Sequence, residues 1–173
     1  MQFLVAAFPL LAETDVDIIQ SYRQLYDPLH SMIDPHFTFV FPVASVDAAT
    51  FVHEVYFRAE WFKQFSFVLR CATVSKDSFS DDYHIFLVPD EGYSHAVKLH
   101  DRLYDGLLLP HRRFDIDYIP HISIARSGDK MKMKDLADEW NVREIAIPGK
   151  IAALEILSYD AGVVKPVDKI ELR

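Results

Sequence analysis

The fold of this chain can be inferred outward from two stretches, Asp34-Pro35-His36-Phe37-Thr38-Phe39-Val40-Phe41 and Ile119-Pro120-His121-Ile122-Ser123-Ile124-Ala125-Arg126. Each has a proline, a histidine and, two residues after the histidine, a hydroxyl side chain among apolar residues. Side chains alternate between the two faces of a strand, so His36 and Thr38 share one face, as do His121 and Ser123. The apolar face of each strand suits packing beneath a helix. We therefore expect both polar pairs to face a cleft.

The order of elements around these stretches occurs twice. In each half, a strand, a helix, a strand carrying the His-x-Thr/Ser pattern and a second helix follow one another. Strands are predicted at 2–8, 36–41, 65–74, 83–88, 121–126, 143–147, 151–159 and 163–172, and helices at 14–26, from 47 onward, at 90–104 and at 129–140.

This repeated order predicts an α+β fold, a bilobal pseudo-two-fold duplication with antiparallel or mixed sheets flanked by helices around a central cleft. We expect a single domain over residues 1–173, with approximate halves 1–80 and 81–173. Each lobe is expected to contribute one central strand to the cleft.

Composition limits the possible partners. Half of the 173 residues are hydrophobic, enough for a sizeable core, and the net charge is −8. Proteins that bind long nucleic acids are usually basic. The negative net charge therefore argues against such a partner, but it allows a small phosphate ligand. The apolar segment 3–12 is interpreted as a first strand, because no basic residue precedes it, and no run is long enough to span a membrane.

The chain has one cysteine, Cys71, so it can form no intrachain disulfide, and no zinc-binding spacing is present. Both observations fit a cytoplasmic protein. Cys71 lies in an apolar run, and we expect it to be a small buried residue rather than a nucleophile.

The paired motifs suit phosphoester chemistry. One histidine beside a hydroxyl is most simply a satisfied core residue, but two copies at matching positions favour a shared site. Histidine exchanges a proton near neutral pH, and a hydroxyl can donate a hydrogen bond to a phosphate oxygen. A phosphodiester needs such an acid, a base and donors, and the scheme requires no metal and no cofactor.

The two stretches resemble the paired motifs of the two-histidine (2H) phosphoesterase superfamily, which includes 2′-5′ RNA ligase-like proteins and cyclic phosphodiesterases. The resemblance implies that His36 and His121 are the catalytic acid–base pair and that Thr38 and Ser123 bind phosphate. The substrate would be a small nucleotide or an RNA end bearing a cyclic phosphate or a 2′-5′ linkage. Hydrolysis and ligation both occur in the family, and the sequence does not choose between them or define the oligomeric state.

Two other functions stay open from sequence alone. The chain could bind a nucleotide or RNA end through this fold without turnover, or the two histidines could be satisfied core residues of a structural protein. The intact pair of motifs favours an enzyme, because a binding protein does not need two histidines that are free to titrate.

Four further residues are possible substrate contacts. Arg112 and Arg113 lie in the long connection before the second motif and could form a phosphate-binding lip or a solvated turn. Tyr118 could stack on a base or belong to the core, and Arg126 could contact phosphate or end its strand in solvent. The remaining histidines considered lack a matching hydroxyl and are assigned structural or surface roles: His53, His84, His95 and His100.

Overall fold

The computed structural model describes all 173 residues and contains four α-helices and nine strands. In chain order, the first half contains β1 (Gln2–Ala7), β2 (Leu10–Leu11), α1 (Glu13–Tyr26), β3 (Phe37–Val43), α2 (Ala48–Ala59) and β4 (Phe65–Lys76). The second half contains β5 (Tyr83–Glu91), α3 (Tyr93–Leu103), the 3₁₀ helix η1 (Gly106–His111), β6 (Ile122–Ser127), α4 (Lys130–Val142), β7 (Ile147–Ile151), β8 (Ala153–Asp160) and β9 (Val163–Glu171).

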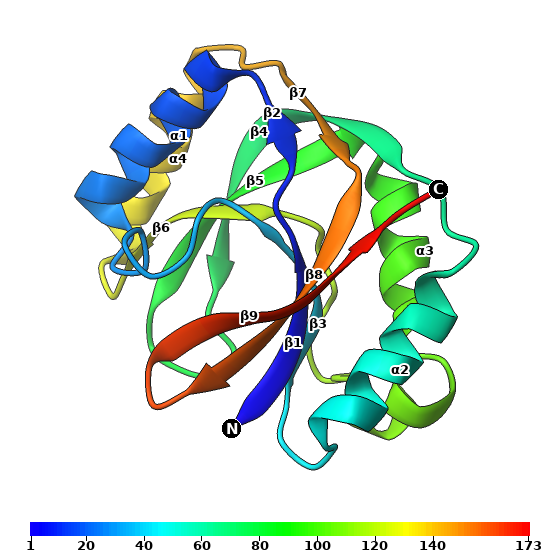
Figure 1. Cartoon of the computed structure of the whole chain (residues 1–173). Helices are drawn as coiled ribbons and strands as arrows, with labels where there is room; N and C mark the ends of the chain where they lie inside the picture. The colour runs from blue at the N-terminus through cyan, green and yellow to red at the C-terminus, as the bar shows by residue number, and fades with distance from the viewer.

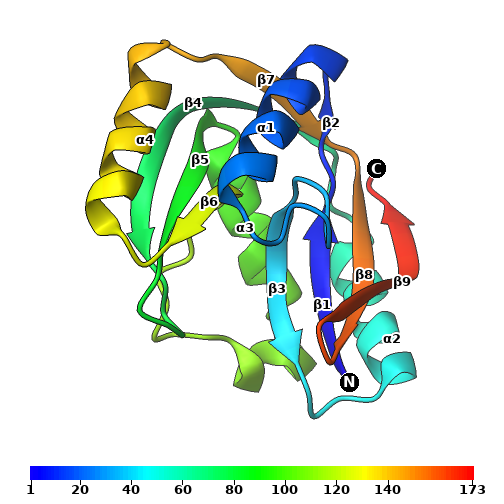
Figure 2. The ribbon, with the colours of Figure 1, turned by 90° about the vertical axis from the view of Figure 1, so that its left-hand side faces the viewer.

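The strands form two antiparallel sheets. One has the order β3-β1-β8-β9 and the other the order β2-β7-β4-β5-β6. Figure 2 shows the sheets side by side, with β3 and β6 as the strands nearest the space between them. The pairing of β1 with β3 is matched by that of β5 with β6, so the predicted α+β duplication with antiparallel sheets is confirmed.

The two halves of the chain exchange elements symmetrically. Strand β4 of the first half pairs with β5, and β8 of the second half pairs with β1. Helix α1, which follows β1 and β2, packs against β6, while α3, which follows β5, packs against β3. As a result α1 and α4 lie together on one side in Figure 1 and α2 and α3 on the other. Each sheet therefore contains strands from both 1–80 and 81–173, so these halves do not coincide with the two sheets.

One core joins the two sheets. A cluster of 36 buried apolar residues takes side chains from both sheets and all four helices. The aromatic face of β3 enters it, because Phe37 and Phe39 are at most 1% exposed. Strand β1 is buried from Phe3 to Ala7, as expected for a continuous apolar run covered on both faces.

The structure corrects two predicted helix starts. Asp47 and Asp129 do cap α2 and α4, through hydrogen bonds from backbone N–H groups of the first turn. However, Thr14 lies inside α1, whose N-cap is Ala12. The predicted start at 90–91 is wrong because β5 continues to Glu91 and α3 follows Gly92, whose φ of +82° suits glycine.

The predicted strand 143–147 is also wrong for most of its length. Helix α4 continues to Val142, a turn follows, and β7 begins only at Ile147. Pro148 and Gly149, between the predicted strands 143–147 and 151–159, lie within β7. A side chain at Gly149 would meet the Phe67 ring, so close packing explains the glycine.

None of the helices is both long enough and apolar enough to cross a membrane.

Candidate active site

His36 and His121 each immediately precede the edge strand of a sheet. His36 leads into β3 and His121 into β6, and these strands end the orders β3-β1-β8-β9 and β2-β7-β4-β5-β6. The expectation of central strands is therefore wrong. Because β3 and β6 border the space between the two sheets, both motifs lie beside that space (Figure 2).

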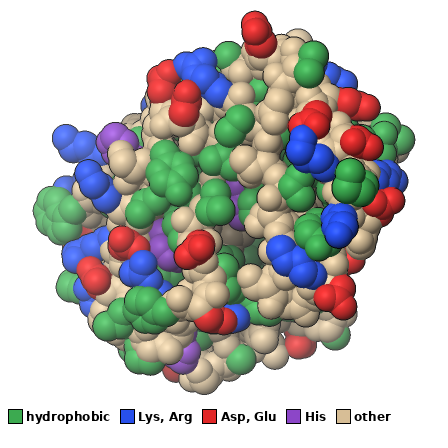
Figure 3. Space-filling model, turned by 180° about the vertical axis from the view of Figure 1, so that it is seen from behind, with side chains coloured by type: hydrophobic (Ala, Val, Ile, Leu, Met, Phe, Trp, Pro, Cys, Tyr) green, Lys and Arg blue, Asp and Glu red, His purple; other side chains and the backbone are tan.

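One pocket of about 110 Å³ contains both motifs. His36 and Thr38 line it from the first half, and His121 and Ser123 from the second. Its remaining walls are polar and apolar side chains that sequence reasoning did not assign to the site: Arg23, Asp27, Leu29, Ile33 and His84. Figure 3 shows histidine side chains in a hollow near the middle of this face of the molecule.

The two histidines are held in the same way. The Nδ1–H of His36 donates to the backbone oxygen of Asp34 at 2.8 Å, and that of His121 donates to the oxygen of Ile119 at 2.5 Å. A carbonyl oxygen only accepts, so Nδ1 carries the hydrogen in both rings. Each ring then keeps Nε2 as the nitrogen available to take up or give a proton at the pocket.

Burial favours the neutral form of both rings. It lowers the pKa of His36 below its ordinary value of 6.5 and lowers the pKa of His121 to about 4. The positive charge of Arg23 lowers the pKa of His36 further, whereas Asp27 opposes this shift. An anion in the pocket would favour the charged imidazolium and so raise both pKa values.

A second pocket of about 220 Å³ adjoins the first. The two pockets share His84, His121 and Ser123. The second is lined mainly from the end of β4, the turn that follows it, β5 and the segment before β6. Its aromatic and aliphatic side chains include Phe41, Phe79, Phe86, Ile116 and Ile119. The Phe86 ring stacks on the His121 ring with centroids 3.5 Å apart. The arrangement places a polar pocket beside a larger, partly apolar one.

Side chains from the second half of the chain form hydrogen bonds with backbone groups on the outer edge of β3. The Tyr118 hydroxyl donates to the oxygen of Thr38 at 3.2 Å, and His100 Nδ1 lies 2.9 Å from the oxygen of Phe39. The Tyr104 hydroxyl accepts from the N–H of Phe41 at 2.9 Å. An edge strand otherwise leaves such groups unpaired, so these contacts fix the strand that carries the first motif.

Tyr118 and the arginines considered from sequence support the cleft rather than line it. Tyr118 stacks on His100 with centroids 3.6 Å apart and is in neither pocket. Arg112 pairs with Asp101 at 2.7 Å. Arg113 pairs with Asp115 and lies over the ring of Phe79, 4.7 Å from its centroid, at the rim of the second pocket.

Arg126 lines neither pocket and pairs with acidic residues beside the second one. Its Nε lies 2.7 Å from Asp82 Oδ2, and its Nη2 lies 3.8 Å from Asp77 Oδ2. Both acidic residues come from the turn between β4 and β5. Arg126 therefore ties the strand of the second motif to that turn.

Sequence reasoning missed the contribution of α1. Arg23 is 2% exposed and pairs with Asp27 through a 2.9 Å contact. A signal existed, because Ile19, Tyr22 and Arg23 follow helical spacing, and a charged residue in that buried stripe needs a partner. His84, which was assigned a structural or surface role, lines both pockets instead. Cys71, expected to be buried, is exposed.

Comparison with known proteins gives a consistent picture. The model of the 2′-5′ RNA ligase superfamily matches residues 9–163. A Bacillus licheniformis protein, provisionally named a phosphoesterase, is 26% identical over 153 residues, covering 80% of this chain and 84% of its own length.

Solved structures with low sequence identity share the fold. A Thermus thermophilus protein superposes with a TM-score of 0.64 at 16% identity, covering 100% of this chain and 98% of that one. Escherichia coli LigT complexed with 3′-AMP superposes with a TM-score of 0.58 at 15% identity, covering 99% of this chain and 97% of that one.

Proposed function

Because the chain belongs to the 2′-5′ RNA ligase superfamily, we propose that it is a phosphoesterase that opens cyclic phosphodiesters of nucleotides or RNA ends, the 2′,3′-cyclic phosphates or related rings. The observation that carries the proposal is the pocket lined by His36, Thr38, His121 and Ser123, in which both imidazoles keep Nε2 available. Residues 1–173 would act as one domain, since each half supplies one motif.

The proposed reaction is a water attack on phosphorus. One neutral histidine takes a proton from the attacking water, and the new oxygen–phosphorus bond forms. The ring bond between phosphorus and one ribose oxygen breaks, and the other histidine, protonated, gives its proton to that oxygen. The Thr38 and Ser123 hydroxyls donate to the non-bridging oxygens, where negative charge increases in the transition state.

The shifted pKa values suggest how the two roles are divided. His121, with a pKa lowered to about 4, stays neutral most readily and is suited to be the base in ring opening. His36 would then carry the proton for the leaving oxygen. In the reverse reaction, in which the phosphate ring closes and water leaves, the two histidines exchange these roles.

The second pocket is suited to the nucleoside part of the substrate. Its aromatic and aliphatic walls can bury a base, while Asp117, Ser75 and Ser78 offer polar partners at its rim. LigT has been solved with 3′-AMP, which supports a nucleotide-sized ligand. The net charge of −8 favours a mononucleotide or a short RNA end over long RNA.

Phosphorus NMR tests the proposal directly. We expect the protein to convert a 2′,3′-cyclic mononucleotide to a single phosphomonoester, with the same rate in the presence of a chelator. A 2′-5′ dinucleotide in a parallel sample distinguishes cleavage of that linkage from ring opening. Binding without any product would favour a nucleotide-binding protein, and a rate abolished by the chelator would contradict the acid–base scheme.

The pH dependence provides a second prediction. In the free protein the acid must be protonated and the base neutral, so kcat/KM should be bell-shaped. With the pKa of His121 at about 4 and that of His36 below 6.5, its maximum should lie between these values. Bound substrate is an anion and raises both pKa values, so the kcat profile should be displaced to higher pH. Steady-state rates over a pH series in buffers of constant ionic strength measure both curves, and a kcat/KM maximum above neutrality would contradict the assignment.

A further inference from the structure

His84 is a third histidine at the junction of the two pockets. It lies on β5, whose residues Ile85 and Leu87 are buried, so His84 and Phe86 take the opposite face. His84 lies directly across from Arg126, and Phe86 lies across from Ser123. This register brings His84 beside the second motif and into the lining of both pockets.

Asp77 fixes the His84 ring. Its Oδ2 lies 2.6 Å from His84 Nε2, and the two side chains are 10% and 17% exposed. The other carboxylate oxygen accepts from the N–H of Phe79 at 2.6 Å and from the N–H of Ser80 at 3.0 Å. Asp77 is thus held at Oδ1 by its own turn and directs Oδ2 at His84.

These bonds leave one ring nitrogen of His84 without a partner. The Nε2 of His84 donates to Asp77, whereas Nδ1 makes no hydrogen bond within the protein and is not among its fully enclosed unpaired polar atoms. Neutral His84 would present a lone pair at Nδ1. Protonated His84 would present an N–H there, next to the pocket that contains His36 and His121.

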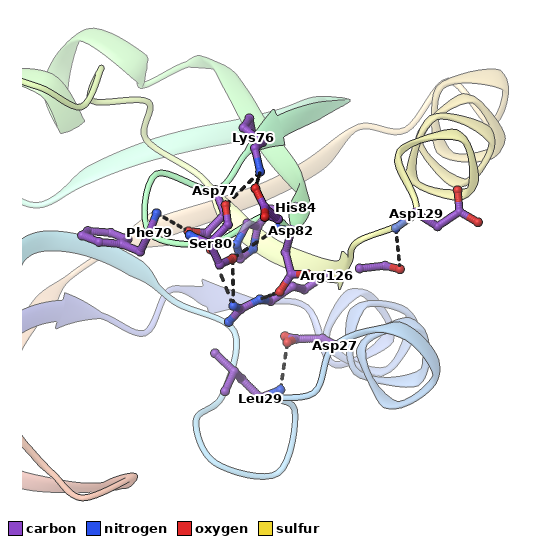
Figure 4. Close-up of polar contacts among 12 residues, drawn as sticks. Asp27, Leu29, Lys76, Asp77, Phe79, Ser80, Asp82, His84, Arg126 and Asp129 are labelled. Carbon is purple, nitrogen blue, oxygen red and sulfur yellow. Dashed lines mark hydrogen bonds and ion pairs between the residues drawn. The ribbon is translucent and has the colours of Figure 1, made fainter.

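The surrounding charges favour an ionised Asp77. Burial raises its pKa, but the hydrogen bonds from His84 and the Phe79 backbone, with the charge of Arg126, outweigh this and hold the pKa below its ordinary value. Arg126 contacts both Asp77 and Asp82, as Figure 4 shows, so it neutralises only one of two carboxylates. His84 is the other side chain in contact with Asp77 Oδ2.

We propose that His84 is a phosphate-binding residue, which donates from Nδ1–H to a phosphate oxygen of the substrate while Asp77 holds its Nε2. The inference rests on the proposed function for its substrate and adds a third imidazole to the site. A phosphate in the pocket and the carboxylate of Asp77 then flank the His84 ring, one at each nitrogen. Arg126 lies across from it on β6. The other titratable groups that line the two pockets with it are Arg23, Asp27, His36, Lys76, Asp117 and His121.

Two amide substitutions separate this role from a structural one. In His84→Asn the amide nitrogen can take the place of Nδ1 but cannot reach Asp77, whereas in His84→Gln the amide can reach Asp77 but leaves Nδ1 unreplaced. For a phosphate-binding role, His84→Gln should raise KM and the dissociation constant of inorganic phosphate about tenfold, the scale of one hydrogen bond between charged groups. His84→Asn should raise them less, and kcat should change little in both.

Asp77→Asn and His53→Gln complete the series. Asp77→Asn keeps a side chain of the same shape without its charge and should weaken phosphate binding in the same direction as His84→Gln. His53, which is exposed on α2, is the matched control, and His53→Gln should bind phosphate as the wild type does. Thermal unfolding of every variant shows whether it is folded.

Phosphate binding, followed by calorimetry with inorganic phosphate alone, keeps the two proposals distinguishable. If His84→Gln retains wild-type phosphate affinity, or His84→Asn binds less tightly than His84→Gln, the role of His84 is overturned while ring opening can stand. If the wild type binds no phosphate yet turns over cyclic nucleotides, His84 is again excluded. If phosphate binding responds as expected but no product forms, the ring-opening reaction fails and the phosphate site remains.

Discussion

Replacing either His36 or His121 with alanine is expected to lower kcat/KM by about 10²–10⁴-fold, the usual contribution of one acid–base group. Each ring offers Nε2 to the same pocket, and no other side chain there is held with the same geometry. The rates are measured with a 2′,3′-cyclic mononucleotide at the pH of the wild-type maximum. His53→Ala, which removes an exposed histidine of α2, is the control and should retain wild-type activity.

The double variant His36→Ala/His121→Ala tests the acid–base assignment more directly than either single variant. If one ring is the acid and the other the base, losing either already disables proton transfer, so the combined loss should be far smaller than the product of the single losses. Effects that multiply would indicate two independent contributions instead. Activity that survives the loss of both rings would show that the pocket is not the site of ring opening.

Loss of the Thr38 or Ser123 hydroxyl should reduce the rate less than loss of either histidine, and should act through phosphate binding. Thr38→Val keeps the shape of the side chain and removes its donor, and Ser123→Ala removes the other donor. Each should weaken phosphate binding and reduce the rate by less than the histidine substitutions do, because one hydrogen bond to a charged phosphate contributes about 1.5–3 kcal/mol. Phosphate inhibition constants measured beside the rates test this order.

The features that could be predicted from sequence are those that follow from the alternation of side chains between the two faces of a strand. The spacing of His36 and Thr38, with Phe37 and Phe39 between and after them, fixed which side chains face the core and which face outward. Repetition of the pattern at His121 made a shared pocket the natural expectation. The structure does bring these residues to one pocket.

Features that depend on contacts between distant elements could not be predicted in this way. The exchange of β4 and β8 between the sheets is a property of strand pairing, which leaves no local pattern. His84 looked ordinary beside Tyr83 and Ile85, since its importance comes from Asp77 and from a cross-strand neighbour far along the chain, Arg126. Gly92 is similar, because its positive φ and the nearby Phe67 backbone are evident only in three dimensions.

The Arg23–Asp27 pair beneath the site is expected to be the most sensitive polar contact for stability. Both side chains are buried, at 2% and 6% exposed, and Arg23 Nε lies 2.9 Å from Asp27 Oδ2. Arg23 also donates to the oxygen of Ile33 at 2.8 Å, and Asp27 accepts from the N–H of Leu29 at 2.9 Å. The pair therefore ties the end of α1 to the loop that leads into His36.

Asp27→Ala should lower the free energy of unfolding by about 3–5 kcal/mol, because it leaves the Arg23 charge buried without a counter-ion. Urea unfolding at neutral pH measures the change. Asp115→Ala is the matched control: it breaks an exposed Arg–Asp pair and should leave the free energy of unfolding nearly unchanged. The double variant Arg23→Met/Asp27→Leu should recover much of the loss, since apolar side chains of similar size can replace a buried ion pair.

The same substitution should be visible in the pH profile. Asp27 raises the pKa of His36 and Arg23 lowers it, so removing the carboxylate leaves only the lowering influence of this pair. The limb of the kcat/KM profile that reports His36 should therefore move to lower pH in Asp27→Ala. Asp115→Ala should leave that limb in place. If Asp27→Ala loses much stability but the His36 limb of the pH profile does not move, the ion pair supports the fold of α1 without acting on His36. A small loss of stability would mean that Arg23 finds another partner.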